Sequence, residues 1–282
     1  MPDTIAAAIR GAAERLAATS DTPRLDAEVL MAHALGVSRS KMLLSHMPDA
    51  VPDTFQVLVS RRMLREPVAY ITGTQEFFGL PFRVNRHVLI PRGDSEVLVE
   101  AALAARPGAR PASCRVLDCG TGSGALLLAV LANLPGAQGT GVDNSFGAVG
   151  VAQDNAERLG LAPRARFLLA DWTSPDWFDY LGGPFDLILA NPPYVEAGAP
   201  LDPDVRDYEP AGALFAGSEG LDDYRALVPQ LPALLAPAGV ALVEIGADQA
   251  EPVSEIAARS GLHTRLHRDL AGRPRVLEMR AN

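Results

Sequence analysis

The stretch RVLDCGTGSGALLLAVL, residues 115–131, decides the fold class that we predict for this protein. It begins as a short apolar strand, passes through glycines at 120, 122 and 124, and continues as an apolar helix. Glycine lets the backbone turn tightly and lets a ligand approach it closely. A strand, a glycine-rich loop and a helix in this order are typical of nucleotide-binding α/β folds. We therefore interpret residues 120–124 as a binding loop.

The segments around this loop alternate between strand and helix patterns. Strand patterns cover residues 115–119, 138–143, 166–171, 185–191 and 239–245, and helical patterns separate them. Such alternation predicts a mostly parallel, doubly wound sheet with helices on both faces. Near the C-terminus, HTRLHRDL (263–270) and PRVLEMR (274–280) flank a turn, which predicts an antiparallel hairpin. The expected fold class is therefore α/β.

The N-terminal part has a different pattern. Apolar residues recur at helical spacing over residues 1–72, and no strand pattern interrupts them. EFFGLPFRV (76–84) then predicts two short strands around a turn at Gly79 to Pro81. We therefore predict a helical domain over 1–72, a hairpin-like connector over 73–91 and an α/β domain over 92–282.

Composition excludes several classes of protein. No stretch approaches the ~20 consecutive apolar residues of a membrane span. The N-terminus lacks the basic start and apolar core of a signal peptide. The two cysteines, Cys114 and Cys119, are too few for a disulfide framework or a cysteine-based metal site. We expect no metal, no membrane contact and a reducing, cytoplasmic setting.

The charge of −9 is unevenly distributed along the chain. Residues 1–72 carry 8 acidic and 8 basic side chains, so 26 acidic and 17 basic side chains fall in 73–282. Nucleic acid is bound mainly by basic surfaces, and the larger part of this chain is therefore a poor candidate for such binding. We interpret the basic group Arg61, Arg62 and Arg65 as a solvated helix face.

Acidic residues follow the next two predicted strands. Asp143 ends its strand about 20 residues after the glycine loop, where a carboxylate can accept hydrogen bonds from two ribose hydroxyls. Asp171 ends the following strand, and Trp172 offers a flat face and an N–H donor beside the expected position of an adenine. The loop also fits the dinucleotide fingerprint, so these residues alone do not choose between cofactors.

DLILANPPYVE, residues 186–196, ends another buried strand with an uncharged amide. Pro192 and Pro193 terminate the strand, because proline cannot donate to a sheet. Ligands of open parallel sheets bind outside the carboxyl ends of the strands, so Asn191 is expected in the same cleft as the glycine loop. Its side-chain oxygen and the Pro192 carbonyl are two acceptors that suit an NH2 group, and Tyr194 can cover the plane of that group. The group is a side-chain amide or the amine of a base.

These motifs together resemble a known family. D-x-G-T-G-S-G, the acid after the second strand and N-P-P-Y are similar to the class I S-adenosylmethionine-dependent methyltransferases that modify planar nitrogens. REPVAYITGTQEFFGLPFRVNRHVLIPRGDSEVLVE (65–100) and NPPYVEAGAPLDPDVRDYEP (191–210) resemble the HemK/PrmC protein-glutamine N5-methyltransferases. The resemblance covers roughly residues 20–280. It implies a class I methyltransferase fold, with the helical residues 1–72 serving substrate recognition.

The resemblance also implies roles for individual residues. Those expected to bind S-adenosylmethionine are Gly120, Thr121, Gly122, Ser123, Gly124, Asp143, Asp171, Trp172 and Asn191. Those expected to bind the substrate glutamine are Asn191, Pro192, Pro193 and Tyr194. The implied substrate is the glutamine of the Gly-Gly-Gln motif in a class 1 peptide chain release factor.

We expect Asn191 and the Pro192 carbonyl to act catalytically by orientation. The amide nitrogen is a poor nucleophile because its lone pair is delocalised, and two acceptors on its hydrogens would aim it at the methyl carbon. Positioning of two reactants can supply ~7–11 kcal/mol of a barrier. We assign no general base. Asp94 and Glu96, in the family's PRxDTE stretch, are candidates for closing the site; PRGDSE and NSFGAVGV (144–151) depart from the usual family pattern.

Other functions are compatible with parts of the sequence. A ribosomal-protein glutamine is an alternative substrate. A nucleic-acid methyltransferase acting on adenine N6 or guanine N2 also uses N-P-P-Y, but it normally needs a basic surface. An NAD-dependent oxidoreductase would leave N-P-P-Y unexplained. A binding protein without activity would not need the loop, Asp143 and Asn191 together.

Overall fold

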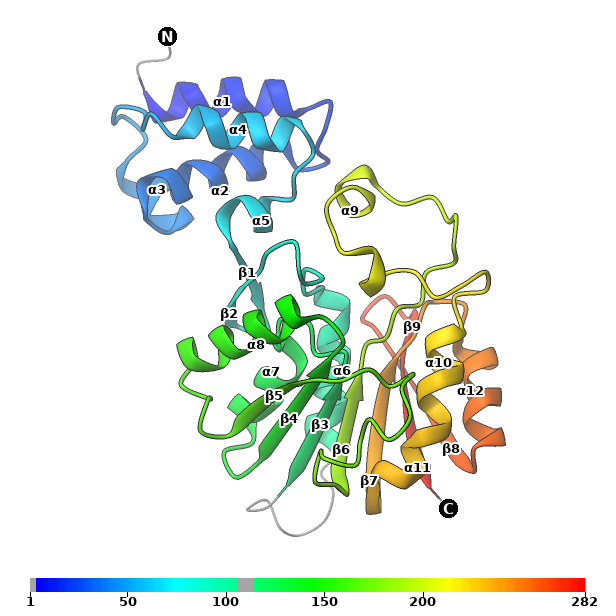
Figure 1. Cartoon of the computed structure of the whole chain (residues 1–282). Helices are drawn as coiled ribbons and strands as arrows, with labels where there is room; N and C mark the ends of the chain where they lie inside the picture. The colour runs from blue at the N-terminus through cyan, green and yellow to red at the C-terminus, as the bar shows by residue number, and fades with distance from the viewer. Residues whose placement is uncertain (1–3, 106–113, 282) are drawn as a thin grey trace. The chain divides into compact units, whose positions relative to one another are not determined.

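The computed structural model describes residues 4–105 and 114–281. The chain divides into two compact units (Figure 1). The first, which we call the helical unit, holds the residues up to Thr74 together with Leu201–Glu209. The second, the sheet unit, holds Gln75–Pro200 and the residues from Pro210 onward. The predicted domain boundaries at residues 72 and 91 place Leu201–Glu209 in the α/β domain. In the structure this segment groups with the N-terminal helices.

The helical unit has the helical character predicted for residues 1–72, and its helices include one from a later segment that was not predicted. They are α1 (Ile5–Leu16), α2 (Pro23–Leu35), α3 (Arg39–Ser45), α4 (Phe55–Met63), α5 (Val68–Thr72) and, from the later segment, α9 (Pro203–Arg206). The Thr4 side chain caps α1 by accepting a hydrogen bond from the Ala7 N–H. Gly36, at φ 66°, ends α2 in the left-handed conformation that glycine adopts without strain. Ile9, Leu30 and Phe55 are fully buried between the helices.

The predicted solvated arginine face is wrong for Arg62. Its side chain is only 8% exposed. Nε lies 2.7 Å from Asp26 Oδ2, and Nη1 lies 2.6 Å from Asp204 Oδ2. The Tyr208 hydroxyl also donates to the Leu64 carbonyl oxygen, at 2.7 Å. These contacts hold the segment Leu201–Glu209 on the helices, and a pattern of charges along one helix cannot show them.

The sheet unit confirms the predicted α/β class. The seven strands of its main sheet are β3 (Arg115–Cys119), β4 (Gln138–Asp143), β5 (Ala165–Leu169), β6 (Phe185–Ala190), β7 (Leu235–Glu244), β8 (Leu262–Arg268) and β9 (Pro274–Ala281). Their order in the sheet is β5-β4-β3-β6-β7-β9-β8 (Figure 1). Strands β3 to β7 pair in parallel, whereas β9 is antiparallel to both β7 and β8. The C-terminal hairpin is thus part of the main sheet.

Alternate residues of the central strands enter two separate cores. Leu187 and Leu189 of β6 pack on one face, with residues of α6 (Glu96–Ala105) and α7 (Ala125–Asn133). Ile188 and Ala190 pack on the other face. The helices of that second face are α10 (Asp222–Leu227), α11 (Leu231–Leu234) and α12 (Ala250–Arg259). Burial on both faces explains the continuous apolar run of β6.

The remaining elements refine the predicted boundaries. α8 (Phe146–Arg158) packs on β4 and β5, and β1 (Thr74–Phe77) pairs with β2 (Leu80–Arg83) in a small sheet. The turn between β1 and β2 is Phe78–Gly79, so Pro81 lies in β2, whereas the sequence predicted it in the turn. Short 3-10 helices are η1 (Gly93–Ser95), η3 (Ala211–Ala213) and η4 (Val228–Gln230).

Candidate active site

The register of the sheet brings the two predicted loops to one edge. Cys119 of β3 is aligned with Ala190 of β6 and with Val142 of β4. The residues that follow these strands, beginning with Gly120 and Asn191, therefore leave the sheet side by side. This is the carboxyl edge, where ligands of parallel sheets bind.

The glycine loop has a backbone that glycine permits. Gly120, Gly122 and Gly124 have φ values of 72°, 53° and 79°. The N–H groups of Gly120 and Thr121 both donate to the Val142 carbonyl, at 2.9 Å, which ties the loop to β4. A Cβ on Gly120 would lie 3.2 Å from the Trp172 ring, whereas a Cβ on Gly122 would meet nothing within 4 Å. The loop therefore has open space in front of its middle glycine, as a bound ligand requires.

Two backbone N–H groups hold the Asp143 carboxylate in place, and its oxygens can accept further hydrogen bonds. Its Oδ2 accepts from the Gly122 N–H and its Oδ1 from the Ser145 N–H, each at 2.9 Å. Burial raises the pKa of Asp143, and the two backbone hydrogen bonds partly oppose that shift. A carboxylate offers about four lone-pair sites, so each oxygen can accept one more hydrogen. Asp143 thus fits the two hydroxyls of a ribose.

A second carboxyl group lies beneath the loop. Asp118 is fully buried and accepts a 2.7 Å hydrogen bond from the Thr121 hydroxyl. Burial, together with the smaller effect of the nearby charge of Asp143, raises its pKa to about 7. Its Oδ1 has no hydrogen-bond partner among the described residues. Asp118 therefore supports the loop from inside the fold.

The structure separates the two residues predicted on the adenine side. Trp172 lines the cavity described below, and its Nε1 donates to Asp223 Oδ1 at 3.3 Å. Asp171 does not line that cavity, since β5 ends at Leu169 and the Asp171 carboxylate accepts from the N–H and hydroxyl of Thr173. On this side of the cavity the lining acid is Asp223, on α10.

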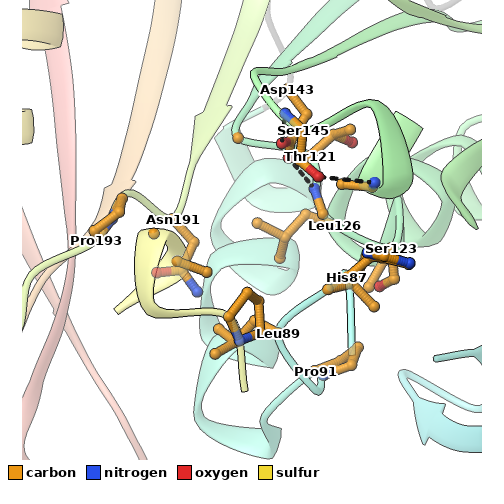
Figure 2. A pocket seen from close by; sticks show the side chains of 18 of the residues that line it. His87, Leu89, Pro91, Thr121, Ser123, Leu126, Asp143, Ser145, Asn191 and Pro193 are labelled. Carbon is orange, nitrogen blue, oxygen red and sulfur yellow. Dashed lines mark hydrogen bonds between the residues drawn. The ribbon is translucent and has the colours of Figure 1, made fainter. Parts of the chain in front are cut away.

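One cavity, with a volume of about 180 Å³, joins these residues within the sheet unit. Its lining includes the glycine loop, Asp143, Trp172 and Asn191. Figure 2 shows Asn191 and Pro193 on the side of β6 and His87, Leu89 and Pro91 on the segment that follows β2. No ligand-binding role was predicted for His87, Leu89 and Pro91, because nothing in the pattern of that segment points to a ligand.

A glycine in α8 makes room for His87 beside the cavity. A Cβ on Gly147 would lie 2.6 Å from His87 Cγ. Only glycine therefore leaves room for the imidazole at this point.

The Asn-Pro-Pro-Tyr loop continues from the first cavity into a second. Asn191 lines both, Pro193 lines the first, and Tyr194 lines the second, which has a volume of about 130 Å³. Pro192 is buried and lines neither. Burial, followed by the charge of Glu244, raises the pKa of Tyr194 to about 12, so its phenol stays protonated. The roles predicted for these four residues stay predictions.

The two acids predicted to close the site bond elsewhere. Asp94 Oδ2 lies 2.6 Å from Arg275 Nη2, and Glu96 Oε1 accepts from the Phe78 N–H at 2.8 Å. Ser95, between them, lines the cavity and contacts Asn191. Among the described residues, no cluster of His, Cys, Asp and Glu is suited to a metal, and no helix is long and apolar enough to cross a membrane.

Comparisons with known proteins agree over most of the chain. A PrmC N-terminal domain model matches residues 7–73, and a methyltransferase domain model matches residues 111–244. A release factor glutamine methyltransferase of Rhodospirillum rubrum is 44% identical over 274 residues, which cover 95% of this chain and 82% of that protein. A release factor glutamine methyltransferase of Bradyrhizobium diazoefficiens is 40% identical, over 98% of this chain and 95% of that protein.

A solved protein-(glutamine-N5) methyltransferase (release factor-specific) of Alicyclobacillus acidocaldarius is 30% identical and aligns with a TM-score of 0.44. The alignment covers 71% of this chain and 100% of that one. More than a third of the residues are identical to those of these relatives, over most of the length of both chains, and the sheet unit has a methyltransferase fold. This similarity shows the family to which the chain belongs. This chain belongs to the release factor glutamine methyltransferases.

Proposed function

We propose that this protein methylates the side-chain nitrogen, N5, of the glutamine in the Gly-Gly-Gln motif of a class 1 release factor. The observation that carries the proposal is the position of Asn191, which lies beside the glycine loop and lines the same cavity as Asp143. An uncharged acceptor next to a cofactor site suits a substrate that is itself an uncharged amide.

The residues present fit S-adenosylmethionine. Asp143 would bind the ribose hydroxyls, Gly122 leaves room for the ligand, and Trp172 offers an aromatic face. When bound, this cofactor supplies an electrophilic methyl group. The protein therefore does not need to create a leaving group.

The contribution of the chain is to orient the glutamine amide. Asn191 Oδ1 and the Pro192 carbonyl would accept its two hydrogens, which favours the geometry in which the nitrogen lone pair points at the methyl carbon. The amide nitrogen would gain the methyl group that the cofactor's sulfur gives up, and it would then lose one proton to solvent. Tyr194 would cover the planar amide.

Two alternatives act on different substrates. A nucleic-acid amine would fit the same two acceptors, but residues 73–282 carry 26 acidic against 17 basic side chains, which opposes a phosphate backbone. A ribosomal-protein glutamine fits the site equally well. The family relatives favour the release factor, which acts in the cytoplasm, and we place the reaction there.

The test uses the full-length protein, S-adenosylmethionine and a bacterial class 1 release factor. Mass spectrometry of the Gly-Gly-Gln peptide should show one added methyl group on the glutamine side chain. A release factor with that glutamine replaced by alanine is the matched control and should stay unmodified. Methylation of ribosomal protein, DNA or RNA in parallel reactions, with none on the release factor, would contradict the proposal.

A further inference from the structure

A buried carboxyl group lies behind Asn191 and is not used by the chemistry described above. Glu244, the last residue of β7, is only 2% exposed and lines the second cavity together with Asn191 and Tyr194. Its Oε2 has no hydrogen-bond partner among the described residues. A buried carboxyl group is costly unless it is hydrogen-bonded or has a function, so its place beside the substrate loop requires an explanation.

Hydroxyl groups connect Glu244 to the substrate loop on two sides. Burial raises the pKa of Glu244, and the hydroxyls of Ser95 and Tyr194, which are placed to donate to its carboxyl, partly oppose that shift. Asn191 Nδ2 in turn donates a long, 3.5 Å hydrogen bond to Ser95 Oγ. A chain of contacts therefore leads from Glu244 through Ser95 to Asn191, and a second leads directly to Tyr194.

The direction of these hydrogen bonds decides which way the Asn191 amide faces. A serine hydroxyl has one proton to donate and lone pairs that accept. If Ser95 donates its proton to a carboxylate at 244, its lone pairs are left for Asn191, so the NH2 of Asn191 faces Ser95. The opposite end of the amide, Oδ1, is then directed away from Ser95. A flipped amide would present NH2 to the NH2 of a substrate glutamine, and two donors repel.

We propose that Glu244 is a positioning residue for methyl transfer, which holds Asn191 through Ser95, and Tyr194 directly, in the arrangement that accepts the glutamine amide. This role rests on the proposed function and concerns the same site. Ser95 carries the effect from one side chain to the other.

The role requires an ionised carboxylate. A protonated Glu244 can donate to Ser95, which frees the Ser95 proton for Asn191 and favours the flipped amide. Burial raises the pKa of Glu244 to about 7. Charged or titratable groups face it or its cavity from four other parts of the unit: Arg275 on β9, Asp94 and Arg92 at η1, Tyr194 after β6, and Tyr224 on α10. Turnover should therefore fall as the pH falls through the pKa of Glu244.

The experiment measures kcat and the affinity for S-adenosylmethionine in the parent, Glu244→Gln, Ser95→Ala and Ser95→Thr, from about pH 5.5 to about pH 9. The cofactor is kept saturating, because the pKa of Asp143 is also raised and would otherwise add its own pH dependence. Calorimetry of cofactor binding shows that each variant is folded. The substrate is the same release factor that the parent methylates.

We expect the parent to lose kcat below a pH of about 7. Glu244→Gln should lower kcat at high pH by roughly tenfold to a hundredfold, the range for a hydrogen bond to a charged group. The kcat of this variant should no longer fall at acidic pH. Ser95→Ala should lower kcat similarly, and Ser95→Thr should restore it. Cofactor affinity should stay within about twofold of the parent in all three, since a twofold change is under 0.5 kcal/mol.

Two results would overturn the positioning role. One is a Glu244→Gln variant with the kcat and pH profile of the parent. The other is a Ser95→Thr variant that is as impaired as Ser95→Ala, because the hydroxyl would then be irrelevant. Both are observed against an active parent, whereas a parent that methylates no release factor glutamine contradicts the proposed function itself.

Discussion

Arg62 and Asp204 lie 142 residues apart in the sequence and form a 2.6 Å ion pair in the structure. Arg62 is on α4, and Asp204 is on α9, in the segment that follows the Asn-Pro-Pro-Tyr loop. The same guanidinium also bonds Asp26 on α2. One buried cation thus joins three segments of the helical unit.

Replacement of Arg62 by alanine should destabilise the helical unit. The change leaves two carboxylates, Asp26 and Asp204, without their shared cation, and breaking a buried ion pair by removing one partner costs about 3–5 kcal/mol. Arg65→Ala is the matched control, because Arg65 is 38% exposed and its pair with Asp204 is longer, at 3.3 Å. Exposed pairs contribute about 0–1 kcal/mol. Urea denaturation measures the free energy of unfolding of both variants. An equal loss in the two would contradict the stabilising role of the buried Arg62 ion pairs.

Replacement of Asp143 by alanine should weaken binding of S-adenosylmethionine by at least about tenfold, since each hydrogen bond to a charged group contributes about 1.5–3 kcal/mol. Isothermal titration calorimetry measures the change. Asp171→Ala is the matched control and should bind like the parent, because the Asp171 carboxylate bonds Thr173 and does not line the cavity. If only Asp171→Ala lost affinity for S-adenosylmethionine, Asp171 rather than Asp143 would be the acid that binds the cofactor. Tight binding of NADH by the parent would contradict both assignments.

Replacement of Asn191 by alanine or aspartate should lower turnover far more than cofactor affinity. Alanine removes the acceptor, and aspartate keeps an oxygen but places a charge beside the substrate amide. Loss of one group that stabilises a transition state typically costs about 10²–10³ in kcat. Single-turnover methylation of the release factor, with calorimetry of cofactor binding in parallel, separates the two effects. An equal loss of both would indicate that Asn191 serves cofactor binding.

Asp118 should make the protein less stable as the pH rises. The pKa of its carboxyl is raised by burial from 3.8 to about 7, so the folded state binds a proton that the unfolded state releases. The free energy of unfolding should therefore fall between these two pH values. Urea denaturation of the parent and of Asp118→Asn, which keeps an acceptor for Thr121 but does not titrate, should show a smaller fall in the variant. Parallel pH dependences would contradict a neutral, buried Asp118.

The sequence alone determined the class of the fold and the ends of its central strands. The predicted strands 115–119 and 138–143 coincide with β3 and β4. The strand predicted over 166–171 ends at Leu169 in the structure, and Asp171, which follows it, does not line the cavity. The conjunction of the glycine loop with Asn191 could be predicted, since parallel strands end at one edge.

Only the tertiary structure decided which polar residues face the site and which are buried. Asp223 rather than Asp171 lines the cavity, Ser95 and Glu244 meet beside Asn191, and Arg62 is enclosed by carboxylates. Strand and helix patterns arise from neighbouring residues, so a sequence displays them directly. The environment of a charge depends on segments that the fold brings together from up to 142 positions away, and no local pattern contains that information.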